Sequence, residues 1–99
     1  MIVYKSKEEV LINAMDNTTD NVLFEITRIE YDIEEDVYTV NAKYSSTTRL
    51  IKPVYKRVKR EDRDISFSDE EIKTLSEEFL NDNAFWGVAA DDYEILNEE

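Results

Sequence analysis

Apolar and polar residues alternate most regularly between residues 22 and 44, in the two runs VLFEITRIEY and VYTVNAKY, which DIEED separates. Alternation with a period of two is typical of a strand with one buried face, so the runs predict two antiparallel strands joined by an acidic turn. The second run is the more regular and predicts one buried and one solvated face. Its buried set is Tyr38, Val40, Ala42 and Tyr44.

The first run changes phase within its length. Strict alternation places Phe24 and Ile26 on one face and the later apolar residues on the other. We therefore expect either a β-bulge near Arg28 or a second face that another body buries. The later apolar residues are Ile29, Tyr31 and Ile33.

Residues 49–63, RLIKPVYKRVKREDR, fit two patterns. Leu50, Val54 and Val58 have the spacing of an amphipathic helix. Pro53 decides against it, because proline inside a helix costs about 3 kcal/mol and its β-branched neighbours favour a strand. Proline also lacks a backbone donor, so we expect a strand that lies at a sheet edge or is interrupted here.

The N-terminal residues carry a weaker helix signal. Ser6 with Glu9 three residues later is a capping-box pattern, which predicts a short helix through Met15 after a strand at residues 1–4. The polar run DNTTDN, residues 16–21, predicts a loop. The expected buried face of the helix is Val10, Leu11, Ala14 and Met15.

The strongest local signal is FSDEEIKTLSEEFL near the C-terminus. Ser68 is a predicted N-cap, Glu71 completes a capping box, and the acids of the first turn suit the positive end of the helix dipole. The residues NDN at 81–83 end the helix. A last apolar set follows, which predicts a short strand or a turn of helix and comprises Tyr93, Ile95 and Leu96.

These elements predict one α+β domain spanning residues 1–99. We expect a small antiparallel sheet of about three to four strands, packed against a C-terminal helix, with a short N-terminal helix. The expected core is Phe24, Ile26, Tyr38, Val40, Val54, Ile72, Leu75 and Phe79.

Charge is segregated along the 99-residue chain, whose formal net charge is -12. Residues 49–63 hold seven cations and two acids, whereas residues 64–99 hold one cation and twelve acids. A polyanionic surface repels nucleic acid and anionic lipid, so we expect direct binding to neither. The N-terminus also lacks the long apolar run of a signal peptide, and we expect the protein to act in a cytoplasm, or in a virion if it is of bacteriophage origin.

The chain offers little catalytic chemistry. It has no Cys, no His and a single Gly, which excludes thiolate and imidazole sites and the glycine-rich nucleotide-binding loops. Paired carboxylates have no diagnostic value among 24 acids. DIEED, residues 32–36, resembles an oxygen-ligand cluster but lacks the glycine of an EF-hand loop, so a solvated turn is the expectation. We predict a non-enzymatic protein without cofactor or metal.

The cations of residues 49–63 have two interpretations. They protect an edge strand against unwanted pairing, or they bind an acidic protein surface, either the C-terminal third of this chain or another subunit. The second interpretation makes them a partner-binding site to which aromatic anchors contribute. The candidate residues are Lys52, Tyr55, Lys56, Arg57, Lys59, Arg60 and Trp86.

Charge segregation favours a protein–protein interaction or assembly subunit, in an oligomer or a hetero-assembly. Small, acidic, Cys-free chains of this composition are typical of bacteriophage proteins, so a virion component is the expected class. The alternative is an acidic nucleic-acid mimic that inhibits a DNA-binding host protein, of the anti-restriction or anti-CRISPR type. Its candidate residues are Glu70, Glu71, Glu77, Glu78 and Asp82.

Overall fold

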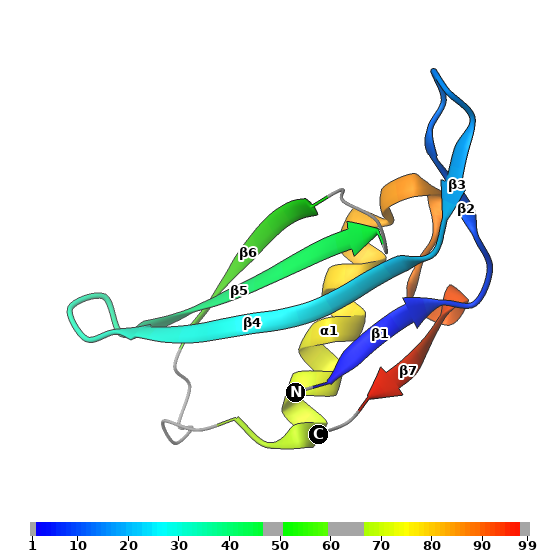
Figure 1. Ribbon diagram of the computed structural model, residues 1–99. Coiled ribbons are helices and arrows are strands. Elements are labelled where there is room, and N and C mark those ends of the chain that lie inside the picture. The colour runs from blue at the N-terminus through cyan, green and yellow to red at the C-terminus, as the bar shows by residue number, and fades with distance from the viewer. Residues whose placement is uncertain (1, 47–50, 60–66, 98–99) are drawn as a thin grey trace.

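The computed structural model describes residues 2–46, 51–59 and 67–97 (Figure 1). The described residues contain seven strands, one α-helix and two short 3-10 segments. In chain order they are β1 (Val3–Ser6), β2 (Val10–Asn13), β3 (Thr18–Asp20), β4 (Val22–Asp32), β5 (Val37–Ser46), β6 (Ile51–Lys59), α1 (Asp69–Asn83), η1 (Phe85–Gly87), η2 (Ala90–Asp92) and β7 (Tyr93–Asn97).

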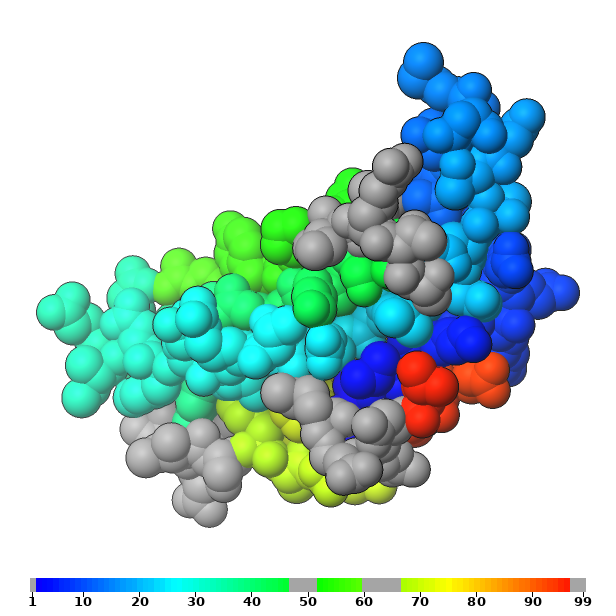
Figure 2. All heavy atoms as spheres, in the orientation of Figure 1, coloured from blue at the N-terminus to red at the C-terminus, as the bar shows by residue number. Residues whose placement is uncertain are grey.

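Five of the strands form one antiparallel sheet in the order β6-β5-β4-β1-β7, and β2 pairs with β3 in a separate hairpin. Helix α1 lies across one face of the sheet (Figure 1). Figure 2 keeps the orientation of Figure 1 and looks onto the side of the sheet away from α1, where β4, β5 and β6 make much of the surface and α1 is visible only at the rim. We call this second side of the sheet the open face.

The prediction of a sheet of three to four strands was wrong. The fifth strand comes from the C-terminal end, where a short strand or a turn of helix was expected: β7 pairs with one side of β1, the strand expected at residues 1–4, and β4 pairs with the other side. Tyr4 is the joining residue, opposite Phe24 on one side and Ile95 on the other. Pairing across some 90 residues depends on tertiary packing, which no local pattern in β1 or β7 specifies.

The prediction of a short N-terminal helix was also wrong. Ser6 ends β1, where its hydroxyl donates to the Glu8 carbonyl oxygen and accepts from the Val22 amide. It therefore joins β1 to the start of β4 and is not free to cap a helix. The β-branched residues Val10 and Ile12 favour a strand, and they form half of the β2–β3 hairpin.

The turn of this hairpin is built from Asx interactions within the run that we expected to be a loop. The Asp16 carboxylate accepts from the Thr18 amide at 3.1 Å, and Asn17 adopts a left-handed backbone with φ 57°. Thr18 then begins β3. Met15, expected on the buried face of the N-terminal helix, lies at the hairpin tip with a relative exposure of 97%.

The β4–β5 pair confirms both the acidic hairpin turn and the predicted bulge. The register shifts between Ile26 and Arg28, which inserts Thr27 as an extra residue. Phe24 and Ile26 before the bulge therefore share a face with the apolar residues after it. The paired residues on this face are Phe24 with Tyr44, Ile26 with Ala42, Ile29 with Val40, and Tyr31 with Tyr38.

Helix α1 begins as predicted. The Ser68 hydroxyl accepts from the Glu71 amide at 3.2 Å, and the Glu71 carboxylate accepts from the Ser68 amide at 3.0 Å, which closes the capping box. The helix ends at Asn83, and Ala84 follows in a left-handed conformation with φ 42°. Its buried residues are Leu75, Ser76, Phe79 and Leu80.

The core lies between α1 and the helix-facing side of the sheet. Six of the eight predicted core residues are buried, and Val54 and Ile72 are partly buried against them. The predicted core omitted seven buried residues, of which Ala42 and Tyr44 were expected on the buried face of their strand. The omitted residues are Ile2, Tyr4, Val22, Ala42, Tyr44, Leu80 and Tyr93.

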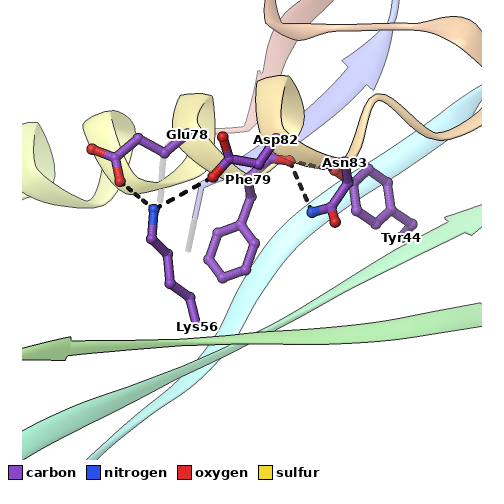
Figure 3. A network of polar contacts seen from close by, with 6 residues as sticks. All are labelled: Tyr44, Lys56, Glu78, Phe79, Asp82 and Asn83. Atoms are coloured by element: carbon purple, nitrogen blue, oxygen red, sulfur yellow. Dashed lines mark hydrogen bonds and ion pairs between the residues drawn. The ribbon is translucent and has the colours of Figure 1, made fainter.

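Two buried tyrosines of this core differ in their hydrogen bonds. The Tyr44 hydroxyl donates to the Phe79 carbonyl oxygen at 3.0 Å (Figure 3). The Tyr93 hydroxyl is buried without a hydrogen-bond partner among the described residues. Burial raises the pKa of Tyr44 to about 12 and also raises the pKa of Tyr93.

The Leu75→Ala substitution tests the helix–sheet core. Leu75 is buried, so its truncation should lower the free energy of unfolding by about 2 to 5 kcal/mol. Chemical denaturation measures this change. Glu77→Ala on the exposed side of the same helix is the control and should stay within about 0.5 kcal/mol of the parent. A near-neutral Leu75→Ala would remove α1 from the core.

Paired Tyr→Phe substitutions should change stability in opposite directions. Tyr44→Phe loses a buried hydrogen bond and should cost about 0.5 to 1.5 kcal/mol, whereas Tyr93→Phe removes an unpaired buried hydroxyl and should stabilise by up to about 1 kcal/mol. Denaturant midpoints measure both changes. A loss in Tyr93→Phe equal to that in Tyr44→Phe would show that its hydroxyl is bonded.

The same two variants should change how the free energy of unfolding decreases at alkaline pH. Both folded-state pKa values lie above the unfolded value of about 10. Their contribution is therefore complete below pH 10 and is lost as the pH rises through the folded-state pKa, about 12 for Tyr44. Each Phe variant should lose less stability over this interval than the parent.

Candidate functional site

The cationic strand β6 is an edge strand, as its proline predicted. Within the described chain it pairs with β5 alone, and its residues alternate between the two faces. Residues opposite the buried side chains of β5 face α1, and the intervening residues lie on the open face. The helix-facing set is Lys52, Val54, Lys56 and Val58, and the open-face set is Pro53, Tyr55, Arg57 and Lys59.

On the helix side, Lys56 connects the sheet edge to α1. Its ammonium lies 2.5 Å from Glu78 Oε1 and 3.7 Å from Asp82 Oδ2 (Figure 3). About a third of the Lys56 side chain is exposed, because its aliphatic stem runs along the body while its charged end reaches water. Lys56 thus binds the acidic C-terminal third of its own chain.

The position of these acids on the helix explains why a cation is needed. Glu78 and Asp82 lie in the C-terminal half of α1, where the dipole is negative, and the last turn has no basic residue. The carboxylates of Glu78 and Asp82 are repelled by the negative end of the α1 dipole and by each other. Lys56 supplies from another strand the positive charge that the helix lacks.

Lys52 makes a second contact just beyond the helix end. Its ammonium lies 4.1 Å from the centroid of the Phe85 ring, within the range of a cation–π interaction. Phe85 in turn contacts Tyr44 edge-on, with ring centroids 4.8 Å apart. Trp86 packs against both rings, half-buried, and has a left-handed backbone with φ 59°.

The open face of β6 carries a different combination of groups. Arg57 forms an ion pair with Glu35 of the β4–β5 turn, and this hydrogen bond raises the pKa of the Arg57 guanidinium. Tyr55 is 69% exposed, which is high for so large an aromatic ring. A shallow hollow is lined by Glu35, Val37, Arg57 and Lys59. We call Tyr55, Arg57 and Lys59 the open-face strip.

The predicted site residues therefore form two groups. Lys52 and Lys56 face the body of the protein, and Trp86 packs on the same side near the helix end. Tyr55, Arg57 and Lys59 point the other way. Arg60 lies outside the described residues.

Sequence reasoning missed the acidic partners of both groups. Glu35 and Glu78 each bind a β6 cation, but they lie 22 residues from it along the chain in opposite directions. The alternation of β6 contained a usable signal, because Lys56 has the phase of Val54 and Val58. That phase indicates a cation directed toward the helix.

The DIEED segment forms the hairpin turn between β4 and β5. The Asp32 carboxylate accepts from the amides of Glu34 and Glu35, at 2.9 and 3.2 Å, and Asp36 is left-handed with φ 55°. In the described part of the chain, no three acidic residues come together in a group able to hold a metal ion. No helix of this part is long and apolar enough to cross a bilayer.

Comparison of the chain with protein-family models, with curated proteins and with solved structures finds no match. Its function must therefore be inferred from the surfaces described above.

A double-mutant cycle of Lys56→Ala and Glu78→Ala measures the connection between β6 and α1. The pair is partly exposed, so we expect a coupling energy of about 0.2 to 1 kcal/mol that decreases as salt is added. Lys59→Ala with Glu77→Ala is the control cycle, since both residues are exposed and Lys59 lies on the open face. Its coupling should be near zero. Equal coupling in both cycles would contradict a specific Lys56–Glu78 contact.

Proposed function

We propose that the chain is a non-enzymatic assembly subunit that binds another protein through the edge and open face of β6. The observation that carries this proposal is the open-face strip, in which an exposed aromatic residue and two cations lie on an unpaired edge. The composition favours a structural component of a bacteriophage virion as the kind of assembly.

Energetics favour a contact that combines charge with apolar burial. Exposed ion pairs contribute about 0 to 1 kcal/mol each and are screened beyond about 8 Å at physiological salt, so they orient an encounter more than they hold it. Tyrosine is enriched among residues that dominate binding energy. Tyr55 is therefore the anchor. Lys59 sets the orientation, and Arg57, which is paired with Glu35 of its own chain, contributes less.

The separation of the β6 cations into a helix-facing set and an open-face set also supports a role in partner binding. Lys52 and Lys56 already contact Phe85 and the helix acids. If edge protection were the sole role of the cations, the exposed aromatic Tyr55 among them would have no explanation. On the open face Tyr55 and Lys59 are exposed, and Lys59 makes no ion pair with another described residue.

The alternative, an acidic mimic of nucleic acid, is less well supported. Of its five candidate acids, Glu71 closes the capping box of α1, and Glu78 and Asp82 share the ammonium of Lys56. Acids that are neutralised internally attract a cationic groove less strongly. Of that set, Glu70 and Glu77 are exposed and make no ion pair with another described residue.

Sedimentation velocity of the purified chain in low and high salt tests the proposal, together with capture of partners from a lysate of the source cells on the immobilised chain. We expect an association that weakens at high salt and that Tyr55→Ser weakens by roughly tenfold or more. Met15→Ser, which also removes an exposed apolar residue, is the control and should have no effect.

Two results would overturn the proposal. One is a chain that stays monomeric and captures no protein in a manner that depends on Tyr55. The other is capture of a DNA-binding protein that excess DNA abolishes and Tyr55→Ser leaves unchanged, which would establish the mimic instead.

A further inference from the structure

The two edges of the five-stranded sheet carry opposite charge. β6 is outermost on one side and β7 on the other (Figure 1). Residues 51–59 hold four cations and no acid. β7, residues 93–97, holds one acid, Glu94, and no cation, and Asp91 and Asp92 of η2 directly precede it. Both complementary surfaces thus belong to the same chain.

The β7 edge also lacks the features that block strand pairing. Natural edges are protected by proline, lysine or inward-pointing charge. β7 has the sequence YEILN, without proline or lysine, and Leu96 on it is 57% exposed. In β6, Pro53 lacks an amide at one position and the cations oppose other cationic edges, but residues 54–59 keep their amides and an acidic edge matches their charge. Among the described residues β7 pairs with β1 alone. β7 is therefore the edge more open to an added strand.

Strand direction defines how two copies can join. Each neighbouring pair in the sheet is antiparallel, and the number of strands is odd, so β6 and β7 run in the same direction. When a second copy continues the sheet with its helix on the same side, its β6 lies parallel to β7 of the first copy. Parallel pairing is a standard ladder, slightly weaker per residue than antiparallel pairing.

The same arrangement brings complementary side chains onto one face. Glu94 is opposite Lys5, which is opposite Leu23, and this set has the phase of the open face. Arg57 and Lys59 also lie on the open face. A parallel β6–β7 pair therefore places Glu94 of one copy on the same surface as the open-face strip of the next.

We infer that the partner of the β6 edge is a second copy of this chain, which docks its acidic β7 edge beside β6 in a head-to-tail contact. This inference rests on the proposed function and specifies its partner. The two symmetric alternatives are unfavourable because β6 against β6 opposes cations and β7 against β7 opposes acids.

Single charge reversals on each edge test the contact. Lys59→Glu alters the β6 edge alone and Glu94→Lys alters the β7 edge alone. In low salt each variant should associate with itself about three- to tenfold more weakly than the parent. An equimolar mixture of the two should regain association, because the intact β6 of one variant meets the intact β7 of the other. Sedimentation velocity measures all three samples, and circular dichroism confirms folding.

Two matched controls separate edge effects from net charge. Arg28→Glu makes the same charge change as Lys59→Glu on the interior strand β4, and Glu77→Lys matches Glu94→Lys on the helix. Neither should weaken association. Hydrogen exchange adds a direct measure of strand pairing: amides of residues 93–97 should gain protection in the assembled parent and lose it in Glu94→Lys.

The possible outcomes separate the inference from the proposed function. If Lys59→Glu weakens association while Glu94→Lys does not, or if the mixture fails to recover, the head-to-tail contact is wrong and the interaction role stands. If the chain is monomeric but binds another protein through Tyr55, the second copy is likewise excluded. If neither self-association nor Tyr55-dependent binding occurs, both fail.

Discussion

The β-bulge at Thr27 determines that α1 needs to cover only one face of the sheet. Without the bulge, the apolar residues of β4 divide between the two faces of the sheet, and one helix cannot cover both. With it, Phe24 and Ile26 before the bulge share the helix-facing side with Ile29 and Tyr31 after it. The other face is then free to carry the open-face strip.

Local signals predicted the elements that local chemistry determines. The capping box of Ser68 and Glu71 and the alternation of β5 both appear as expected, because each depends on residues within a few positions. The same logic failed at Ser6 and Glu9, where an identical spacing occurs at the end of a strand. There the Val22 amide, 16 residues away, binds the Ser6 hydroxyl.

The sequence predicted where the candidate site lies, but not how its residues divide between the helix-facing side and the open face. Pro53 and the cations indicated an edge strand, and strand alternation alone separates Lys56 from Arg57. Which face meets the helix depends on the register with β5, where Lys56 is opposite buried Val40. The acidic edge β7 could not be identified in advance, because its position in the sheet depends on β1, at the other end of the sequence.

The odd number of strands gives any structure that continues this sheet a polarity. Among the described strands, β6 is outermost at one end and β7 at the other, so the two ends are chemically unlike and need not grow at the same rate. Strands twist by about 20 to 25° from one to the next, so successive copies rotate by roughly 100° or more. Such an assembly is a strongly twisted helix of subunits with two unlike ends. A chain able to pair through only one of its edges would stop its growth.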